Sequence, residues 1–287
     1  MSAKVIDGKA VAQRVKDEVK KGVIELVEKY GEPACPYLAL VLCGSDPVSA
    51  RLVEMKKRDC ESVGIAAAIF RVPESAGQSA LLELIAKLDG DENVTGILCQ
   101  LPLPEGFDTR AVIHAISPAK DADGFSARLD STKDDICACT PAGVIRLLEE
   151  YGVEIAGAEA VVIGRSNIVG KPMALQLMLR GATVTVCHTL TGDLAAHTRS
   201  ADIIICAAGS PHLITADMVK PGAVVIDVGV TYGDSGIVGD VDFEEVSAVA
   251  SAITPCVGGV GPMTRAMLLH NTLRLAQMQA EGCCKER

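Results

Sequence analysis

The loop from Gly164 to Lys171 has the residue types of a phosphate-binding site. It follows an apolar run at residues 160–163, typical of a buried parallel strand, and leads to Pro172, which suits the first turn of a helix. Backbone N–H groups at the start of a helix can bind phosphate. Gly164 and Gly170 enclose five residues, so the loop is neither G-x-G-x-x-G nor a P-loop. The pattern favours phosphate binding, and a purely structural turn is the alternative.

Three other polar or glycine-rich stretches follow predicted strands or helices. Gln100 comes at the end of a strand, where ligands of open α/β sheets bind, but a strand-capping role is equally compatible with its position. The acidic turn at residues 118–125 is typical of a solvated surface turn. The loop at residues 253–264 contains three glycines and two prolines, which indicates that its backbone closely approaches a ligand or another strand.

The elements around Gly164 form a strand-turn-helix-strand unit. The helix that begins near Pro172 is expected to end at Gly181, and a second strand is predicted at residues 183–187. Two more strands are predicted at residues 201–207 and 223–228, separated by a helix that ends near Gly222. Together these elements predict a dinucleotide-binding parallel sheet of the Rossmann type.

The amino-terminal half predicts a further α/β layer. Helices are expected at about residues 11–30, 47–63, 79–88 and, at the end of the chain, 265–279, and strands at 37–43, 65–72 and 94–101. This alternation predicts parallel strands joined by right-handed crossovers. The expected fold class is therefore α/β, with two α/β domains.

Length and composition limit the class of protein. The chain has 287 residues, 49% of them hydrophobic, which is enough for two domains with separate cores. The net charge of −10 disfavours nucleic acid as a partner, because phosphate neutralisation needs a basic surface. Without a membrane-length apolar run or a signal-peptide pattern, a cytoplasmic protein with no membrane partner is expected.

The eleven cysteines lack the spacing of a metal site. No C-x-x-C pair is present, so zinc binding is not expected. Cys43, Cys99, Cys187 and Cys206 lie in apolar runs, where a thiol behaves as a small apolar side chain. Free thiols in this number favour a reducing compartment.

Five motifs occur in a fixed order along the chain. They are Lys56 in a helix after Ser49, QLPLP at 100–104, KDADGF at 120–125, GRSNIVGKP at 164–172 and GGVGPMT at 258–264. Together they resemble the methylenetetrahydrofolate dehydrogenase/methenyltetrahydrofolate cyclohydrolase family, over nearly the whole chain. The resemblance implies a homodimer, a cleft flanked by two α/β domains, oxidation of 5,10-methylenetetrahydrofolate with NADP, and hydrolysis of the methenyl product to 10-formyltetrahydrofolate.

The resemblance also implies roles for single residues. Lys56 would be the catalytic lysine, Gln100 its hydrogen-bonding partner, and Asp123 the carboxylate that binds the pterin ring. The substrate-binding residues would be Leu52, Ser49, Pro102, Gly259 and Pro262. The cofactor-binding residues would be Gly164, Arg165, Ser166, Gly170, Lys171, Pro172, His188, Thr189, Gly209 and Val230. No metal is expected, since hydride passes directly to the nicotinamide. The implied folate-binding catalytic domain comprises residues 1–139 and 267–287, and the NADP-binding domain residues 140–266.

The chain departs from the family pattern at three places. Leu52 stands where the family usually has a tyrosine, the segment at 126–129 is shorter and lacks an asparagine, and Val257 replaces a common proline. Loss of the tyrosine removes a stacking contact with the folate. Two alternatives to the bifunctional enzyme follow: a dehydrogenase with weak or no cyclohydrolase activity, and a regulatory homologue that binds folate or nucleotide. The second sheet alone would also suit a nicotinamide dehydrogenase for another substrate.

The end of the strand at 183–187 bears on the choice of cofactor. NAD-specific sheets usually place an acidic residue there to bind the ribose hydroxyls, whereas this chain has His188 and Thr189. Arg165 and the Thr189 hydroxyl suit a 2′-phosphate, although Leu190 occupies a place that is often basic in the family. The sequence therefore predicts NADP over NAD.

Overall fold

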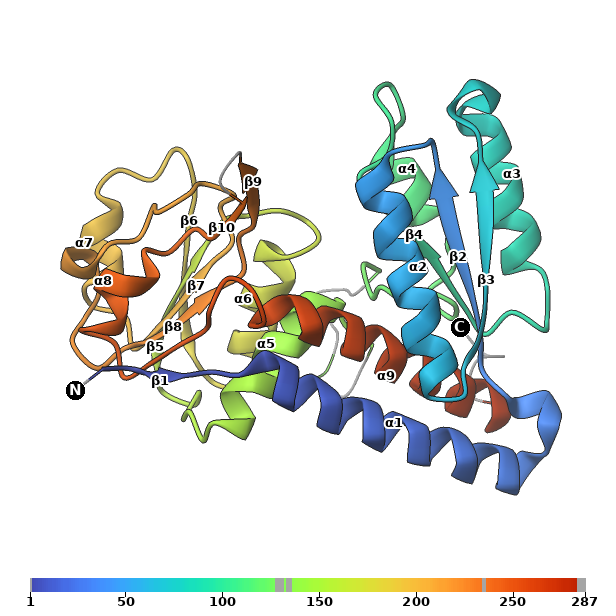
Figure 1. Ribbon diagram of the computed structural model, residues 1–287, viewed down its shortest axis with the longest axis horizontal. Coiled ribbons are helices and arrows are strands. Elements are labelled where there is room, and N and C mark those ends of the chain that lie inside the picture. The colour runs from blue at the N-terminus through green and yellow to red at the C-terminus, as the bar shows by residue number, and fades with distance from the viewer. Residues whose placement is uncertain (1, 127–131, 133–135, 234–235, 283–287) are drawn as a thin grey trace. The chain divides into compact units, whose positions relative to one another are not determined.

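The computed structural model describes residues 2–126, 132, 136–233 and 236–282, which form two compact units (Figure 1). The first unit comprises residues 1–13 and 129–264, and the second comprises residues 14–128 and 265–287. Each unit contains its own sheet and helices. No helix in these described ranges is long and apolar enough to cross a membrane.

The first unit is built on a six-stranded parallel sheet with the order β1-β11-β8-β7-β5-β6. Its strands are β1 (Lys4–Val5), β5 (Glu159–Ile163), β6 (Thr183–Cys187), β7 (Ile203–Cys206), β8 (Val224–Asp227) and β11 (Ala252–Ile253). The central strands β7 and β8 are buried along their whole length, which explains their continuous apolar sequence. A separate antiparallel pair joins β9 (Thr231–Gly233) to β10 (Gly236–Val238).

Helices cover the two faces of this sheet (Figure 1). They are α5 (Cys139–Glu150), α6 (Gly170–Met178), α7 (Leu194–Thr198) and α8 (Phe243–Ser247). Helix α6 packs on β5 and β6, as the right-handed crossover between these strands requires. The predicted dinucleotide-type sheet is thus present, with its chain reversal between β5 and β7.

The second unit contains a three-stranded parallel sheet with the order β3-β2-β4. Its strands are β2 (Tyr37–Cys43), β3 (Ala66–Val72) and β4 (Gly96–Cys99), and its helices include α2 (Pro47–Ser62), α3 (Gly77–Asp89) and α4 (Thr109–His114), with two 3-10 turns, η1 (Glu32–Ala34) and η2 (Glu74–Ala76). Two longer helices, α1 (Gly8–Tyr30) and α9 (Val260–Ala280), begin in the first unit and continue into the second. The predicted βαβαβ alternation with parallel pairing is confirmed.

The predicted helix between β7 and β8 is wrong. Only a 3-10 turn, η3 (Ala216–Met218), forms there. Gly209 and Pro211 interrupt any helix at the start of the segment, and Ile214 forms a parallel bridge with Val241 instead of a helical turn. The connection is consequently an extended loop that packs against the segment before α8.

Two further features differ from those that the sequence predicted: the residue at which the last helix starts, and the unit to which residues 1–13 belong. Helix α9 starts at Val260, inside the glycine-rich motif, because Pro262 in its first turn needs no N–H partner. Residues 1–13, expected in the folate-binding domain, lie in the first unit, where β1 pairs with β11. A strand of two residues has no periodicity, so no sequence pattern indicated either β1 or β11.

The four cysteines placed in apolar runs are buried. Cys43 and Cys99 are 4% exposed, and Cys187 and Cys206 are fully covered. Burial raises the pKa of the Cys99 thiol to about 12, with a further contribution from the charge of Asp123. These thiols therefore behave as the small apolar side chains that the sequence predicted.

Candidate active site

Lys56 and Gln100 meet at the carboxyl edge of the three-stranded sheet. Helix α2 begins after β2 with Pro47 in its first turn, and the Asp46 side chain caps it by accepting a 2.7 Å hydrogen bond from the Ser49 N–H. Further along the same helix, Lys56 Nζ donates to Gln100 Oε1 at 2.9 Å.

Gln100 directly follows β4 and is buried. Its Nε2 donates to the carbonyl of Leu101 at 2.5 Å, and the peptide between Leu101 and Pro102 is cis. With its N–H₂ group held by the chain, Gln100 presents its oxygen to the lysine. Gln100 thus links helix α2 to the end of β4, and its role towards a ligand stays a prediction.

The acidic turn after α4 is not a solvated surface turn, so that interpretation is wrong. Asp121 is buried and forms a bridge with Ile97, and its carboxylate accepts hydrogen bonds from the N–H groups of Gly124 at 2.9 Å and Ser126 at 2.7 Å. Asn271 of α9 donates to the carbonyl of Ala122 at 3.1 Å. The turn is therefore fixed from both sides, with Asp123 at its tip.

Asp123 lies within electrostatic range of Lys56. Burial raises the pKa of the Asp123 carboxyl from its usual 3.8 to about 6; the positive charge of Lys56 opposes this rise and the charge of Asp121 adds to it. Lys56, Gln100 and Asp123 thus come together within the second unit, although they are far apart in the sequence. A perturbed carboxyl beside a lysine at a strand end is typical of a catalytic site.

The other expected substrate residues of the second unit differ in how they are placed. Leu52 lies four residues before Lys56, on the same face of α2, and is half-buried. Ser49 is buried at the start of that helix and its N–H is taken by Asp46. Pro102 is exposed beside Gln100.

The loop between β5 and α6 in the first unit brings backbone segments into close approach. A Cβ atom at Gly164 would lie 2.2 Å from the Ala207 carbonyl oxygen, and one at Gly170 would lie 2.1 Å from the Gly164 carbonyl oxygen. Ser166 Oγ accepts from the N–H of Gly170 at 3.3 Å. Only glycine fits at these two places, so the turn from strand to helix is fixed by sequence.

The charged groups of this loop are accessible to a ligand. Arg165 and Lys171 are exposed, Lys171 Nζ donates to Asn167 Oδ1 at 2.7 Å, and Pro172 lies in the first turn of α6. A helix start with glycines and two cations suits the phosphates of a dinucleotide. The loop therefore fits the cofactor that the sequence predicted.

The loop after β6 is held by hydrogen bonds of His188. His188 Nδ1 accepts from the Leu190 N–H at 3.1 Å, and the His188 N–H donates to Thr191 Oγ1 at 2.8 Å. Thr189 is exposed, as is Leu190 at 79%. No acidic side chain follows this strand before Asp193, which caps α7.

The start of helix α1 lies close to the glycine-rich segment at residues 258–262. A Cβ atom at Gly8 would lie 1.8 Å from the Gly259 carbonyl oxygen, and the Lys9 N–H donates to the Gly258 carbonyl at 3.1 Å. The close approach expected from the glycines is thus made by the start of α1. Gly259 and Pro262 belong to the first unit, whereas Lys56 belongs to the second.

The loop after β7 contains a feature that the sequence did not reveal. Gly209, which the resemblance assigned to cofactor binding, is exposed there, and its N–H donates to the buried Asp240. Val230, which follows β8, is 45% exposed. Asp240 had no sequence signal beyond standing between a glycine and an apolar residue.

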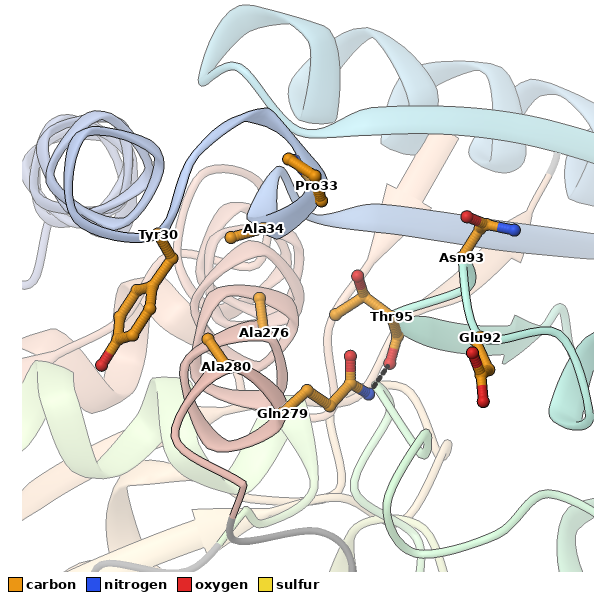
Figure 2. Close-up of a pocket in the computed structure, with 9 residues that line it drawn as sticks. All are labelled: Tyr30, Pro33, Ala34, Glu92, Asn93, Thr95, Ala276, Gln279 and Ala280. Carbon is orange, nitrogen blue, oxygen red and sulfur yellow. Dashed lines mark hydrogen bonds between the residues drawn. The ribbon is translucent and has the colours of Figure 1, made fainter.

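A cavity of about 310 Å³ lies at the opposite edge of the three-stranded sheet (Figure 2). It is lined by residues that precede β2 and β4 and by the end of α9. Gln279 lines the cavity, and its side-chain amide donates to the Thr95 carbonyl at 2.9 Å (Figure 2). Since Lys56 and Gln100 lie at the carboxyl edge, this cavity is not part of their site.

Comparison with known proteins identifies relatives along most of the chain. The model for the tetrahydrofolate dehydrogenase/cyclohydrolase catalytic domain matches residues 6–123, and the model for the NAD(P)-binding domain of the same family matches residues 138–280. "Bifunctional protein FolD" of a Nitratiruptor species is 50% identical over 279 residues, which cover 96% of this chain and 98% of the relative.

Solved structures agree with these sequence matches. FolD methylenetetrahydrofolate dehydrogenase/cyclohydrolase from Campylobacter jejuni is 44% identical, with a TM-score of 0.91 over 97% of this chain and 100% of that one. The Trypanosoma brucei methylenetetrahydrofolate dehydrogenase-cyclohydrolase, complexed with NADP and an inhibitor, is 37% identical, with a TM-score of 0.91 over 97% of this chain and 99% of that one. The similarity thus extends through both units.

Proposed function

Because this chain belongs to the tetrahydrofolate dehydrogenase/cyclohydrolase family, we propose that Lys56, Gln100 and Asp123 carry out its folate chemistry. The enzyme oxidises 5,10-methylenetetrahydrofolate to the methenyl form with NADP, and hydrolyses the methenyl product to 10-formyltetrahydrofolate. The observation that carries the residue assignment is the hydrogen bond from Lys56 to Gln100 beside Asp123.

Hydrolysis of the methenyl bridge requires movement of protons. Water adds to the bridging carbon and loses a proton. The bond from that carbon to N5 then breaks, N5 takes up a proton, and the hydroxyl on the carbon loses its proton to become the formyl carbonyl, so that one proton is released overall. Lys56 is placed to take up and return these protons, with Gln100 fixing its ammonium group through the 2.9 Å hydrogen bond. The lysine therefore acts on the bridge while the glutamine acts through the lysine.

Asp123 is assigned to the pterin ring. Its carboxylate can accept two parallel N–H bonds from the amino-pyrimidine edge, a geometry that fixes the ring in orientation as well as in place. Since Asp121 and Asn271 hold the turn, the backbone that carries this carboxylate is fixed before the substrate arrives. Such preorganisation favours reaction once the substrate is bound.

In this assignment the second unit binds folate and the first unit binds NADP. When bound, NADP supplies the acceptor for the hydride that leaves the one-carbon bridge. The glycine turn at Gly164 and Gly170 would hold the pyrophosphate, and the exposed Arg165 and Thr189 would bind the 2′-phosphate. The implied bounds of 140–266 for the NADP-binding domain stay a prediction; in the structure residues 1–13 belong to the same unit as the six-stranded sheet.

Replacing Arg165 by alanine is expected to reduce the preference for NADP over NAD. A guanidinium bound to the 2′-phosphate contributes only to NADP, so the ratio of kcat/KM for the two cofactors should fall by about 10-fold or more, as expected for a hydrogen bond to a charged group. Arg199→Ala is the matched control, because Arg199 is exposed but paired with Asp217. An unchanged cofactor ratio in Arg165→Ala would remove this arginine from the 2′-phosphate site.

Leu52→Tyr is expected to improve binding of folate or the rate of hydrolysis. An aromatic stacking contact contributes about 0.5–1.5 kcal/mol, which corresponds to at most about tenfold in affinity. Arg51→Tyr, on the exposed side of α2, is the matched control. Weaker folate binding in Leu52→Tyr, measured by calorimetry, would show that the pocket is shaped around leucine.

The two activities of the purified enzyme can be separated in one experiment. Reduced cofactor and methenyl product are followed at their own wavelengths after addition of methylenetetrahydrofolate with NADP or NAD, and hydrolysis is followed from added methenyl substrate. Turnover in both assays supports the bifunctional assignment. Turnover of the dehydrogenase alone would indicate that Leu52 marks a weakened cyclohydrolase, and binding without turnover would indicate a regulatory homologue.

The chain is further proposed to act as a cytoplasmic homodimer. Strand β6 is an edge strand of the six-stranded sheet, and its Val186 is exposed, so a second copy could cover it. The nine described cysteines are free thiols, in keeping with a reducing compartment. Light scattering of the purified protein measures the assembly state, and a monomer at assay concentrations would contradict the dimer.

A further inference from the structure

The loop that follows β7 is held by a buried carboxylate from a distant part of the chain. Asp240 Oδ2 accepts from the N–H groups of Ala208 at 2.7 Å and Gly209 at 2.9 Å, and its Oδ1 accepts from the N–H of Ser210 at 2.8 Å. Asp240 is fully buried, whereas the three loop residues are exposed. The loop therefore turns its donors inward and offers its outer surface to solvent or to a ligand.

A second buried carboxylate holds the first in place. Asp227, at the end of β8, accepts from the Asp240 N–H at 3.1 Å and from the Val241 N–H at 3.3 Å, and its own N–H donates to Thr254 Oγ1 at 2.7 Å. Burial raises the pKa of Asp227 to about 6, and the neighbouring charge of Asp240 adds to the rise. The sheet thus positions Asp227, Asp227 positions the backbone of Asp240, and Asp240 positions the loop.

Two glycines next to these carboxylates cannot be replaced by larger residues, because the carboxylates occupy the space that a side chain would need. A Cβ atom at Gly229 would lie 2.0 Å from the Asp240 carboxylate, and one at Gly239 would lie 1.9 Å from Asp227 Oδ2. Two adjacent buried carboxylates are costly to fold, because each loses hydration and each repels the other. Such a cost is typical of a site where a fixed geometry serves function.

The position of the loop on the sheet indicates which part of a dinucleotide would bind there. Along the carboxyl edge the strands follow the order β6-β5-β7, and the chain reverses between β5 and β7, where dinucleotides bind. In this arrangement the end of β6 would face the adenosine half of a bound dinucleotide, the glycine turn after β5 the pyrophosphate, and the loop after β7 the nicotinamide half. A Cβ atom at Gly164 would be 2.2 Å from the Ala207 carbonyl, so the two loops are neighbours.

We propose that Asp240, supported by Asp227, is a positioning residue that fixes residues 208–210 as the contact surface for the nicotinamide half of NADP. The inference rests on the proposed function of the first unit. By satisfying three consecutive N–H groups from within the protein, Asp240 prevents the loop from turning these donors towards the cofactor. The loop then meets the nicotinamide ribose with one fixed backbone conformation, which sets the angle at which hydride arrives.

The test compares the whole cofactor with a fragment of it. Asp240→Asn replaces one accepting oxygen by an N–H₂ group that faces loop donors, so the loop must move. Titration calorimetry then measures binding of NADP and of adenosine 2′,5′-bisphosphate, which lacks the nicotinamide half. We expect NADP to bind about 10- to 100-fold more weakly, as for loss of hydrogen bonds to a charged group, with the fragment unchanged within about twofold.

Kinetics provide the second readout. In Asp240→Asn the KM for NADP should rise and the dehydrogenase kcat should fall, while hydrolysis of added methenyl substrate, which needs no hydride transfer, should keep its wild-type rate. Asp242→Asn is the matched control, because Asp242 caps α8 through the Glu245 N–H and does not hold residues 208–210. If Asp240→Asn cannot be purified folded, Asp227→Asn is measured in the same way, with the same pattern and a smaller loss expected.

The outcomes separate this inference from the proposed function. Equal loss of NADP and fragment binding would show that Asp240 only stabilises the unit, and unchanged NADP binding and kinetics would show that the loop does not need it; either result overturns the inference. If the wild-type protein itself fails to bind or turn over NADP, the proposed function fails first. Selective loss of NADP with retained fragment binding supports the positioning role.

Discussion

Replacing Lys56 by methionine is expected to lower the rate of methenyl hydrolysis by about 10²–10⁴-fold, the usual contribution of general acid–base catalysis. Methionine keeps most of the volume of the lysine stem but has neither its charge nor its donors, so folate should still bind within a few-fold. Hydride transfer depends on positioning more than on a base, and the dehydrogenase rate should fall less. Stopped assays of each reaction with saturating substrate measure the difference.

The neighbouring lysine provides the control for this variant. Lys57 lies on the same helix and pairs with Glu61, so Lys57→Met makes the same chemical change away from Gln100. Adding Gln100→Ala to Lys56→Met should cost little beyond Lys56→Met alone, because the glutamine acts through the lysine. Wild-type rates for Lys56→Met in both assays would contradict the catalytic assignment and favour the regulatory homologue.

Asp123→Asn is expected to reduce kcat/KM by about 10²-fold in both reactions. An amide offers only one accepting oxygen and turns an N–H₂ group towards the donors of the pterin edge, so charge-assisted hydrogen bonds are lost. Asp46→Asn is the matched control, since asparagine caps a helix as well as aspartate does. A loss in only one of the two reactions would show that Asp123 serves a chemical step and not the common substrate.

The raised pKa of Asp123 predicts the pH dependence of the wild-type enzyme. Above a pH of about 6 the carboxyl is ionised and accepts hydrogen bonds from the substrate; below it, kcat/KM should fall by about tenfold per pH unit. This limb should disappear in Asp123→Asn, and its persistence there would assign it to another group. A pH–rate profile of methenyl hydrolysis from about pH 5 to 8 measures both enzymes.

The same shift has a consequence for stability. The folded state binds the Asp123 proton more tightly than the unfolded chain does, so this group favours folding most below pH 3.8 and progressively less as the pH rises to about 6. Asparagine carries no charge to desolvate, and Asp123→Asn should be at least as stable as wild type at neutral pH. Urea unfolding at neutral pH should therefore show no loss of stability in Asp123→Asn, although the activity of this variant is reduced.

The sequence predicted those helices and strands that have a clear pattern of apolar residues or an end marked by a capping residue or a proline. Strand β2 and helix α2 are examples, because an apolar run and a proline after an N-cap mark their limits. The extended connection from β7 to β8 was not predictable in this way. Its conformation depends on Asp240, which is 30 residues from Ser210 along the chain, and no local pattern reports such a contact.

The candidate site was predictable to different degrees. Lys56, Gln100 and Asp123 were identified through resemblance, and no spacing in the sequence alone would have paired them. The residues themselves favoured a solvated acidic turn, because the contacts that hold the turn, from Ile97 of β4 to Asp121 and from Asn271 of α9 to Ala122, come from distant parts of the chain. The short segment at 126–129 that departs from the family lies mostly outside the described residues.

The pairing of β1 with β11 has a consequence for how the chain folds during synthesis. Residues 4–5 form their strand only beside residues 252–253, and residues 14–128 share a unit with α9. The ribosome therefore releases the first 128 residues long before either unit can be completed, unlike a protein whose amino-terminal domain folds first. The nascent chain must keep residues 4–5 available until β11 has been made and residues 14–128 available until α9 has been made, and this long-range closure is expected to slow folding.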